Sequence, residues 1–412
     1  MRISALFPGI PSVFRANFFH LVMDIAWWGV FNGSAVIFLP IFVTRLGASA
    51  FQIGILTAIP AAMNILLAFP AGVISQRYPV LRANLVVAVL NRALFFPIIL
   101  LPFFLTSDAL VQAILLTTVL MNIPGACTGI LGPAFLGECV PPNLRAQTVS
   151  IRFAALAAVT MLTSLLCGKI LNNMPFPLAY QIVFFIGFVG LGMSVFHLTR
   201  TRSYASLNLP GKELEMAAPP LEPQGQRLVW LGILQGPFGK VLAILFFSQF
   251  SLNLAASLVP LYLVRGLALS DAVISLGSSI FWVLFFFGSI LSGRLFSRLS
   301  QKSVTSLGII LVAFSTVLFA YSVQLWIYVV CQVLSGMGWG LLISGQFNYV
   351  LARTPAAGRT TYLTWYNLAM NLALLGGALL GPLMAGKTGL FEALLVVAVL
   401  RFIAGLVIQK WG

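Results

Sequence analysis

Twelve apolar segments, each long enough for a membrane-spanning helix, constrain this sequence more than any other feature. The hydrocarbon core of a bilayer is about 30 Å thick, so a helix needs about 20 apolar residues to cross it. The first six segments cover residues 16–43, 51–74, 83–105, 109–137, 148–171 and 178–199, and the second six cover residues 241–264, 272–293, 303–322, 325–351, 361–386 and 389–409. Hydrophobic residues make up 60% of the chain and charged residues 8%. The sequence therefore predicts an all-α membrane protein with twelve transmembrane helices.

A polar, proline-bearing stretch separates the two sets of six segments. Residues 200–227 contain three of the eight acidic residues, and residues 228–240 mix apolar residues with Gly and Pro. We expect an N-terminal six-helix bundle at residues 1–199 and a C-terminal six-helix bundle at residues 241–412. The linker between them, residues 200–240, is expected to include a helix that lies along the membrane interface.

The distribution of Lys and Arg predicts the orientation in the membrane. When the termini and the linker are assigned to one side, that side holds 17 of the 23 basic residues. Loops on the cytoplasmic side of membrane proteins are enriched in such residues. We therefore expect a multi-pass protein of the plasma (inner) membrane with both termini in the cytoplasm.

The two halves repeat each other in sequence. The segment FLPIFVTRLGAS (38–49) matches LVPLYLVRGLALS (258–270) at an offset of 220 to 221 residues, and GVISQR (72–77) matches GRLFSR (293–298) at 221. The segment RAQTVSIR, from Arg145, matches RTTYLTWY, from Arg359, at an offset of 214. Parallel repeats of this kind place a binding site at mid-membrane between the two halves.

Several other classes of protein do not fit this sequence. The basic residues are dispersed between apolar blocks, whereas a nucleic-acid interface needs them clustered on one solvated face. The four cysteines lack the paired spacing of a zinc site. We expect a monomer in the lipid bilayer with no metal, no cofactor, no nucleic-acid partner and no enzymatic activity.

The loop between the second and third segments resembles the signature of the major facilitator superfamily, which runs Gly-x-x-x-Asp-Arg-x-Gly-Arg-Arg. Here GVISQRYPVLR supplies Gly72, Arg77 and Arg82, while Gln76 replaces the usual acid. The second copy of the loop has Gly293 and Arg298. The resemblance implies two pseudo-symmetric six-helix bundles, with Gly72, Arg77, Gly293 and Arg298 in gating loops; alternatively, the arginines only set the topology.

A carboxylate in the middle of the first segment is the main candidate for chemistry. Asp24 costs about 2.5 to 3.5 kcal/mol at the centre of a membrane helix, so it needs a partner, water or a proton. His20, Asp24, Trp28 and Asn32 recur every four residues and form one stripe, which the family resemblance places on the central cavity. Arg92 lies at about the same depth as Asp24. Arg152, about one turn into the fifth segment, is a second possible partner, because the family resemblance places that helix next to the first. The group is thus either a structural ion pair or a site for proton coupling, with His20 as a neighbour or proton relay.

Further polar and aromatic residues lie on segments that face the cavity in this family. They predict a substrate cavity lined by Trp28, Asn32, Asn122, Gln249, Asn253, Trp282, Gln332, Ser335, Trp339, Trp365, Asn367 and Asn371. Such a cavity fits an apolar or amphipathic guest that is neutral or singly cationic, with Asp24 as the counter-charge. The alternative for each amide is a hydrogen bond between helices.

The sequence as a whole predicts a secondary active transporter. We expect it to move a small organic solute by alternating access, as a proton-coupled exporter. Uptake or lipid flipping by the same fold is the first alternative, and a sensor or assembly factor that does not transport is the second.

Overall fold

The computed structural model describes residues 14–204, 232–354 and 359–412, and all of the regular structure in these ranges is helical. It contains twelve helices that are long and apolar enough to cross a membrane, in agreement with the twelve predicted segments. Most of the predicted linker, including the start of its interfacial helix, lies outside the described residues, and the domain boundaries at residues 200 and 240 stay predictions.

The first six spans form one bundle. They comprise α1 (Arg15–Phe31), η2 (Asn32–Val36) and α2 (Ile37–Arg45) in span 1, α3 (Ala50–Arg77) in span 2, α4 (Val80–Ala93) and α5 (Phe96–Phe104) in span 3, α6 (Ser107–Cys139) in span 4, α7 (Arg145–Asn173) in span 5 after a short turn η3 (Pro142–Leu144), and α8 (Leu178–Thr199) in span 6.

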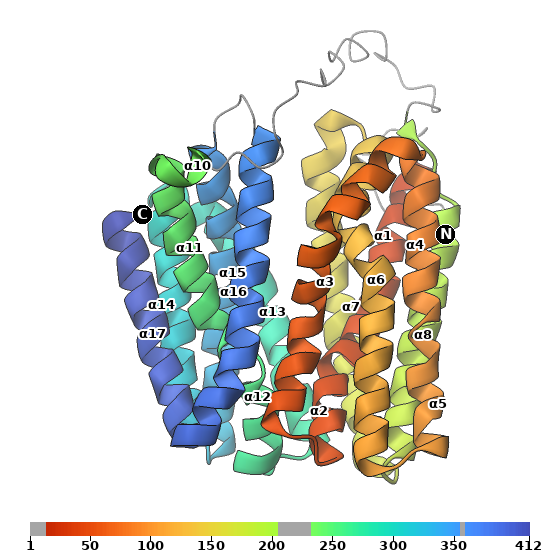
Figure 1. The fold of residues 1–412 in the computed structure, drawn as a ribbon, viewed down its shortest axis with the longest axis vertical. Coiled ribbons are helices and arrows are strands. Elements are labelled where there is room, and N and C mark those ends of the chain that lie inside the picture. Colours follow the sequence, from red (N-terminus) through yellow and green to blue (C-terminus); the bar gives the residue numbers. More distant parts are fainter. Residues whose placement is uncertain (1–13, 205–231, 355–358) are drawn as a thin grey trace.

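The last six spans form the second bundle. A short helix α10 (Gly232–Gln235) precedes α11 (Pro237–Asn253), α12 (Leu258–Leu261) and η5 (Tyr262–Gly266) in span 7, which are followed by α13 (Asp271–Leu295), α14 (Gln301–Ala320), α15 (Leu325–Arg353), α16 (Arg359–Thr388) and α17 (Leu390–Trp411). The two bundles stand side by side in Figure 1, with the ends that flank the linker on one face. We call this the linker face and the other the far face.

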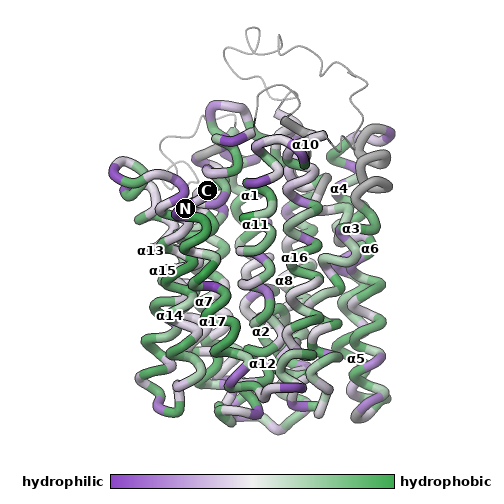
Figure 2. Tube along the Cα trace, turned by 60° about the vertical axis from the view of Figure 1, so that its left-hand side comes forward, coloured by the Kyte–Doolittle hydropathy of each residue, from purple (hydrophilic) through white to green (hydrophobic). Residues whose placement is uncertain are grey.

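The polarity of the helices follows the requirement of a bilayer. Figure 2 shows hydrophobic residues along most of each helix and hydrophilic residues mainly near the two faces. At the far face, span 2 begins with a capping box, because Ser49 N–H donates to Gln52 Oε1 (2.7 Å) and Gln52 N–H donates to Ser49 Oγ (3.2 Å). Ser270, the equivalent residue in the repeat, caps α13 through a bond from Val273 N–H.

The bundles contact each other along two edges, α3 against α16 and α7 against α13. On the first edge, a Cβ added to Gly54 would lie 2.7 Å from the carbonyl oxygen of Ala378, so the two backbones touch there. On the second, a Cβ at Gly168 would collide with the side chain of Ser275. Gly54 and Ser275 are 221 residues apart, the offset of the sequence repeat, so the two edges are related by pseudo-symmetry.

Contact between the bundles is concentrated from mid-membrane to the far face. Asn64 donates to Asn371 at 3.1 Å near mid-membrane, and Ser279 Oγ donates to the carbonyl of Met161 at 3.2 Å. Nearer the far face, buried residues of both bundles, including Ile41 and Leu261, belong to one apolar cluster. In Figure 1, α3 and α16 diverge toward the linker face. The far face is therefore the closed one in this state.

Candidate functional site

Asp24 lies at the centre of a buried charge cluster in the N-terminal bundle. Arg92 Nη2 is 3.5 Å from Asp24 Oδ1, and Arg152 Nη2 is 3.3 Å from Asp24 Oδ2. Ser194 Oγ donates to Oδ1 at 2.5 Å. Only 5% of Asp24 is exposed, so protein groups occupy both carboxylate oxygens and little surface is left for a solute.

The two arginines are themselves held by other groups. Arg152 Nη1 donates to the carbonyl of Leu21 at 2.5 Å, and the guanidinium carbon of Arg92 lies 5.6 Å from the centroid of the Trp28 ring. Arg92 Nη1 is buried and has no hydrogen-bond partner in the described part of the chain. The three charged residues together carry one excess positive charge, so Asp24 does not act as a free counter-charge for a cation in this state.

The Asp24 side chain points toward other helices of the N-terminal bundle, so the charge cluster lies inside that bundle. Its partners come from α4, α7 and α8, which are spans 3, 5 and 6. The other stripe residues also contact this bundle, because Trp28 packs on Phe31 and Arg92, and Asn32 Nδ2 donates to Thr160 Oγ1 at 3.2 Å. In this state the Asp24 carboxylate is ion-paired, and its role in proton coupling stays a prediction.

His20 pairs with His197, which the sequence reasoning did not identify. The two Nδ1 atoms are 2.9 Å apart, so one ring donates and the other accepts. His197 lies one turn beyond Ser194 on α8. Its helical spacing from Ser194 could have been read from the sequence, but the partner of His20 could not.

The predicted cavity amides divide into those that join helices and those that bond within one helix. Asn371 accepts from Asn64 across the bundles, and its own Nδ2 donates to Asn367 Oδ1 at 2.8 Å. Asn122 donates to the carbonyl of Thr118, and Asn253 donates to that of Gln249, one turn earlier in each case. Gln249, Trp282, Gln332, Ser335 and Trp339 are half-buried.

Trp365 lines a small apolar cavity of about 330 Å³ between α10, α11 and α16. Its Nε1 is buried and has no hydrogen-bond partner in the described part of the chain. Leu242 and Phe246 of α11 line the same cavity.

The predicted gating residues lie apart near the linker face. The Arg77 and Arg298 side chains are exposed, and a Cβ at Gly293 would meet nothing within 4 Å. Gly72 is in α3, in a stretch whose side-chain surroundings lie outside the described residues. The gating assignment stays a prediction.

Arg401 is a buried cation with a local structural explanation. Span 7 is interrupted between Asn253 and Leu258, and helix ends leave carbonyl groups without partners. Arg401 donates to the carbonyls of Ser251 (3.4 Å) and Leu252 (2.6 Å) at this interruption, and also to Thr316 Oγ1. In the described part of the chain, no three His, Cys, Asp or Glu side chains come together as a metal site would require.

Comparison with known proteins identifies the architecture. The model of the Major Facilitator Superfamily matches residues 18–242 and 241–411. A search of curated proteins finds no match.

Solved structures of similar fold cover nearly the whole chain. A D-xylose-proton symporter superposes with a TM-score of 0.73 at 16% identity, covering 97% of this chain and 98% of its own. The xylose transporter XylE from E. coli, in a partially occluded inward open conformation, gives 0.70 at 15% identity, with the same coverages. A bacterial homologue of the iron transporter ferroportin, in an inward-facing state, also gives 0.70 at 15% identity with the same coverages. The twelve helices, the two related bundles and a family match along almost the entire sequence show that this chain belongs to the Major Facilitator Superfamily, which confirms the resemblance seen in its loop motif.

Proposed function

We propose that this chain transports a small organic solute by alternating access between its two bundles. The observation that carries the proposal is the asymmetric contact between them. The bundles touch from mid-membrane to the far face, while α3 and α16 diverge toward the linker face. A carrier that binds its solute between two such repeats and rocks them against each other passes through a state of this kind.

The proposed solute is apolar or amphipathic. The amide of Asn371 lies where the bundles meet, since it accepts from Asn64 of α3, and Asn367 bonds to Asn371 within α16. A pocket with mostly apolar walls and a few hydrogen-bonding groups binds a solute of that chemistry. Because Asp24 is already paired with two arginines, it offers no free counter-charge in this state, so of the neutral and singly cationic solutes expected from the sequence we propose a neutral one.

Counterflow in proteoliposomes tests the transport proposal without a coupling ion. Vesicles that contain purified protein are loaded with an unlabelled candidate solute, and uptake of the labelled solute is followed. We expect transient accumulation with at least one apolar or amphipathic solute from a library. If folded protein shows counterflow with no solute of the library, the sensor or assembly alternative is favoured.

We propose proton-coupled export as the form of this transport. The distribution of basic residues predicts that the linker face is cytoplasmic, so the state described here would load a solute from the cytoplasm. A D-xylose-proton symporter shares the fold, so proton coupling is compatible with this architecture. Asp24 is the only carboxylate deep in a span of this sequence, and it would have to leave one arginine to accept a proton.

The coupling role of Asp24 has a direct test. We expect Asp24→Asn, assayed on the fraction of protein that remains folded, to abolish solute flux driven by a pH gradient while counterflow continues. Lys169→Gln, on an exposed residue near the far face, is the control and should leave both intact. If Asp24→Asn folds and keeps its pH-driven flux, the carboxylate is a structural ion pair alone.

A further inference from the structure

Two arginines at the far face cross between the bundles in a reciprocal manner. Arg45 Nη2 donates to the carbonyl of Leu269 at 2.9 Å, and Arg265 Nη2 donates to the carbonyl of Ala48 at 2.6 Å. Arg45 and Arg265 are equivalent positions of the sequence repeat, 220 residues apart, and Ala48 and Leu269 are equivalent at 221. The two hydrogen bonds are therefore one contact made twice, once from each bundle.

One side of this reciprocal contact carries an additional carboxylate. Arg45 Nη2 and Nε lie 2.8 and 3.0 Å from Asp271 Oδ1, and Nε also donates to the hydroxyl of Tyr180 at 3.2 Å. The repeat equivalent of Asp271 is Ala50, so Arg265 has no carboxylate partner among the described residues and bonds to carbonyls. Hydrogen bonds between charged groups are stronger than neutral ones, so Arg45 makes the stronger half of the contact.

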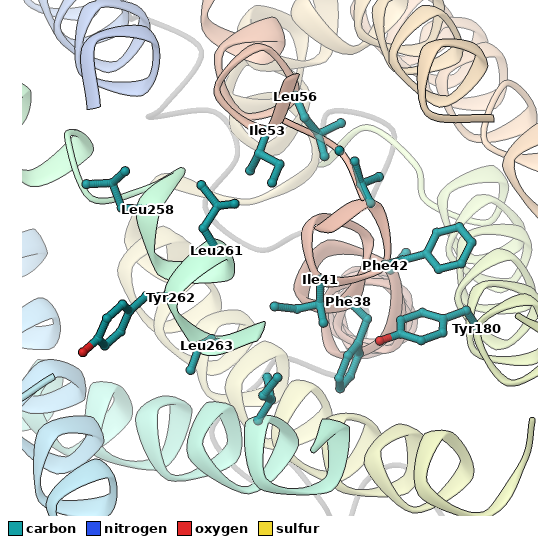
Figure 3. Close-up of a cluster of buried hydrophobic side chains, with 14 of the residues drawn as sticks. Phe38, Ile41, Phe42, Ile53, Leu56, Tyr180, Leu258, Leu261, Tyr262 and Leu263 are labelled. Atoms are coloured by element: carbon teal, nitrogen blue, oxygen red, sulfur yellow. The ribbon is translucent and has the colours of Figure 1, made fainter. Parts of the chain in front are cut away.

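The arginines lie above an apolar layer that closes the far face. Figure 3 shows Ile41 of α2 and Leu261 of α12, which extend from facing helices. Both are buried, with 2% and 1% of their surface exposed, and they are also equivalent positions of the repeat. Arg45, Arg265 and Asp271 line a cavity of about 690 Å³ at the far face. The polar contact is thus the outermost layer of the closure, and the apolar residues form the layer beneath it.

We propose that Arg45, Arg265 and Asp271 form a clamp that controls opening of the far face. The inference rests on the proposed function, since it assigns these residues to the conformational step of alternating access. The bundles cannot separate at this face unless both arginines release the carbonyls of the opposite bundle. Weakening either arginine raises the population open at the far face, and weakening both raises it further.

Chemical labelling of a buried reporter tests the clamp. Ile41→Cys places a thiol in the apolar layer, and the four native cysteines are buried. The labelling rate by a polar maleimide is measured on purified full-length protein in lipid nanodiscs, with and without the reporter. We expect Arg265→Gln to raise the rate about 3- to 10-fold, the range for losing one net hydrogen bond. Arg45→Gln also loses the bonds to Asp271 and should raise the rate more than Arg265→Gln does. The double variant should exceed both.

A matched control separates the clamp from a general effect of charge. Lys169→Gln removes one positive charge near the same face from an exposed side chain, and it should leave the labelling rate unchanged. If a glutamine variant fails to fold, Arg45→Lys and Arg265→Lys keep the charge but lose the forked geometry, and they should give a smaller increase. The double variant with Arg45→Asp and Asp271→Arg restores an opposite-charge pair. Its labelling rate should lie closer to the parental rate than the rate of either single variant does.

Two results would overturn the clamp: parental labelling rates in folded arginine variants, or an equal increase in the Lys169→Gln control. Labelling requires no solute, so its outcome is independent of counterflow. Unchanged labelling with active counterflow removes the clamp alone. Increased labelling with no counterflow for any solute keeps the clamp and removes the transport proposal.

Discussion

Neutralising Asp24 should strongly destabilise the N-terminal bundle. Asp24→Asn keeps the size of the side chain but removes the carboxylate charge beside Arg92 and Arg152, whose side chains are only 10% and 17% exposed. At an effective dielectric constant of about 20, opposite unit charges about 4 Å apart attract each other by about 4 kcal/mol. Breaking a buried ion pair from one side costs about 3–5 kcal/mol because the other charge stays buried. We expect Asp24→Asn to lower the free energy of unfolding by this amount.

The assay is reversible unfolding of the purified protein by SDS in mixed micelles, with a double-mutant cycle. Arg92→Gln leaves Asp24 paired with Arg152, so it should lower the free energy of unfolding less than Asp24→Asn does. The combined variant leaves one unpaired guanidinium instead of two, so the losses should be non-additive by about 1–3 kcal/mol. Equal stability of Asp24→Asn and the parent, or strictly additive losses, would refute the ion-pair reasoning.

Three further predictions use the same unfolding assay. Gly168→Ala places a methyl group against Ser275 and should lower the free energy of unfolding by about 1–3 kcal/mol. Its control is Gly192→Ala, where a Cβ meets nothing within 4 Å and the free energy of unfolding should not change. Equal effects of the two variants would contradict the close contact. Arg401→Leu leaves the carbonyls of Ser251 and Leu252 without the arginine and should lower the free energy of unfolding by at least about 1–3 kcal/mol. An unchanged free energy would show that the interruption of span 7 does not need the arginine. Trp365→Phe removes a buried N–H that has no partner among the described residues, so it should be neutral or stabilising. A loss of unfolding free energy above about 1 kcal/mol would reveal an acceptor for that N–H.

Sequence reasoning predicted the spans because a bilayer imposes a strict length and polarity on each of them. The interruptions within spans were not predictable in the same way. Span 7 breaks after Asn253 and is stabilised there by Arg401, which lies almost 150 residues later in the chain. A break of this kind depends on a distant partner, and local sequence does not identify that partner.

The candidate site could be predicted in part. Counting residues from the membrane face put Asp24 and Arg92 at one depth, because the rise of a helix per residue is fixed. Arg152 was expected near Asp24 only because the family resemblance places its helix next to span 1. The rotation of α1 was not determined by that count. It follows from packing, since Gly29 lies against Leu156 and Val159 of α7 and the Asp24 side chain contacts Ser194 on α8.

The residues of the far-face clamp could be paired from the sequence, but their contacts could not. Alignment of the repeats paired Arg45 with Arg265 and Ser49 with Ser270. It could not show that each arginine bonds to the opposite bundle, because that contact depends on how the bundles pack and which face is closed. The loop signature directed attention to Arg77 and Arg298 near the linker face, where the described helices diverge.

Alternating access itself is tested most directly by distances between spin labels on the two bundles. One pair replaces Arg77 and Arg298, which are exposed near the linker face, and the other replaces Lys169 and Lys387, which are exposed near the far face. Double electron–electron resonance is recorded for each pair, with the native clamp and with Arg45→Gln and Arg265→Gln together. We predict that the distance near the linker face shortens as the distance near the far face lengthens. Distances that stay fixed in every sample, or that lengthen at both faces together, would contradict a carrier whose bundles rock about a central site.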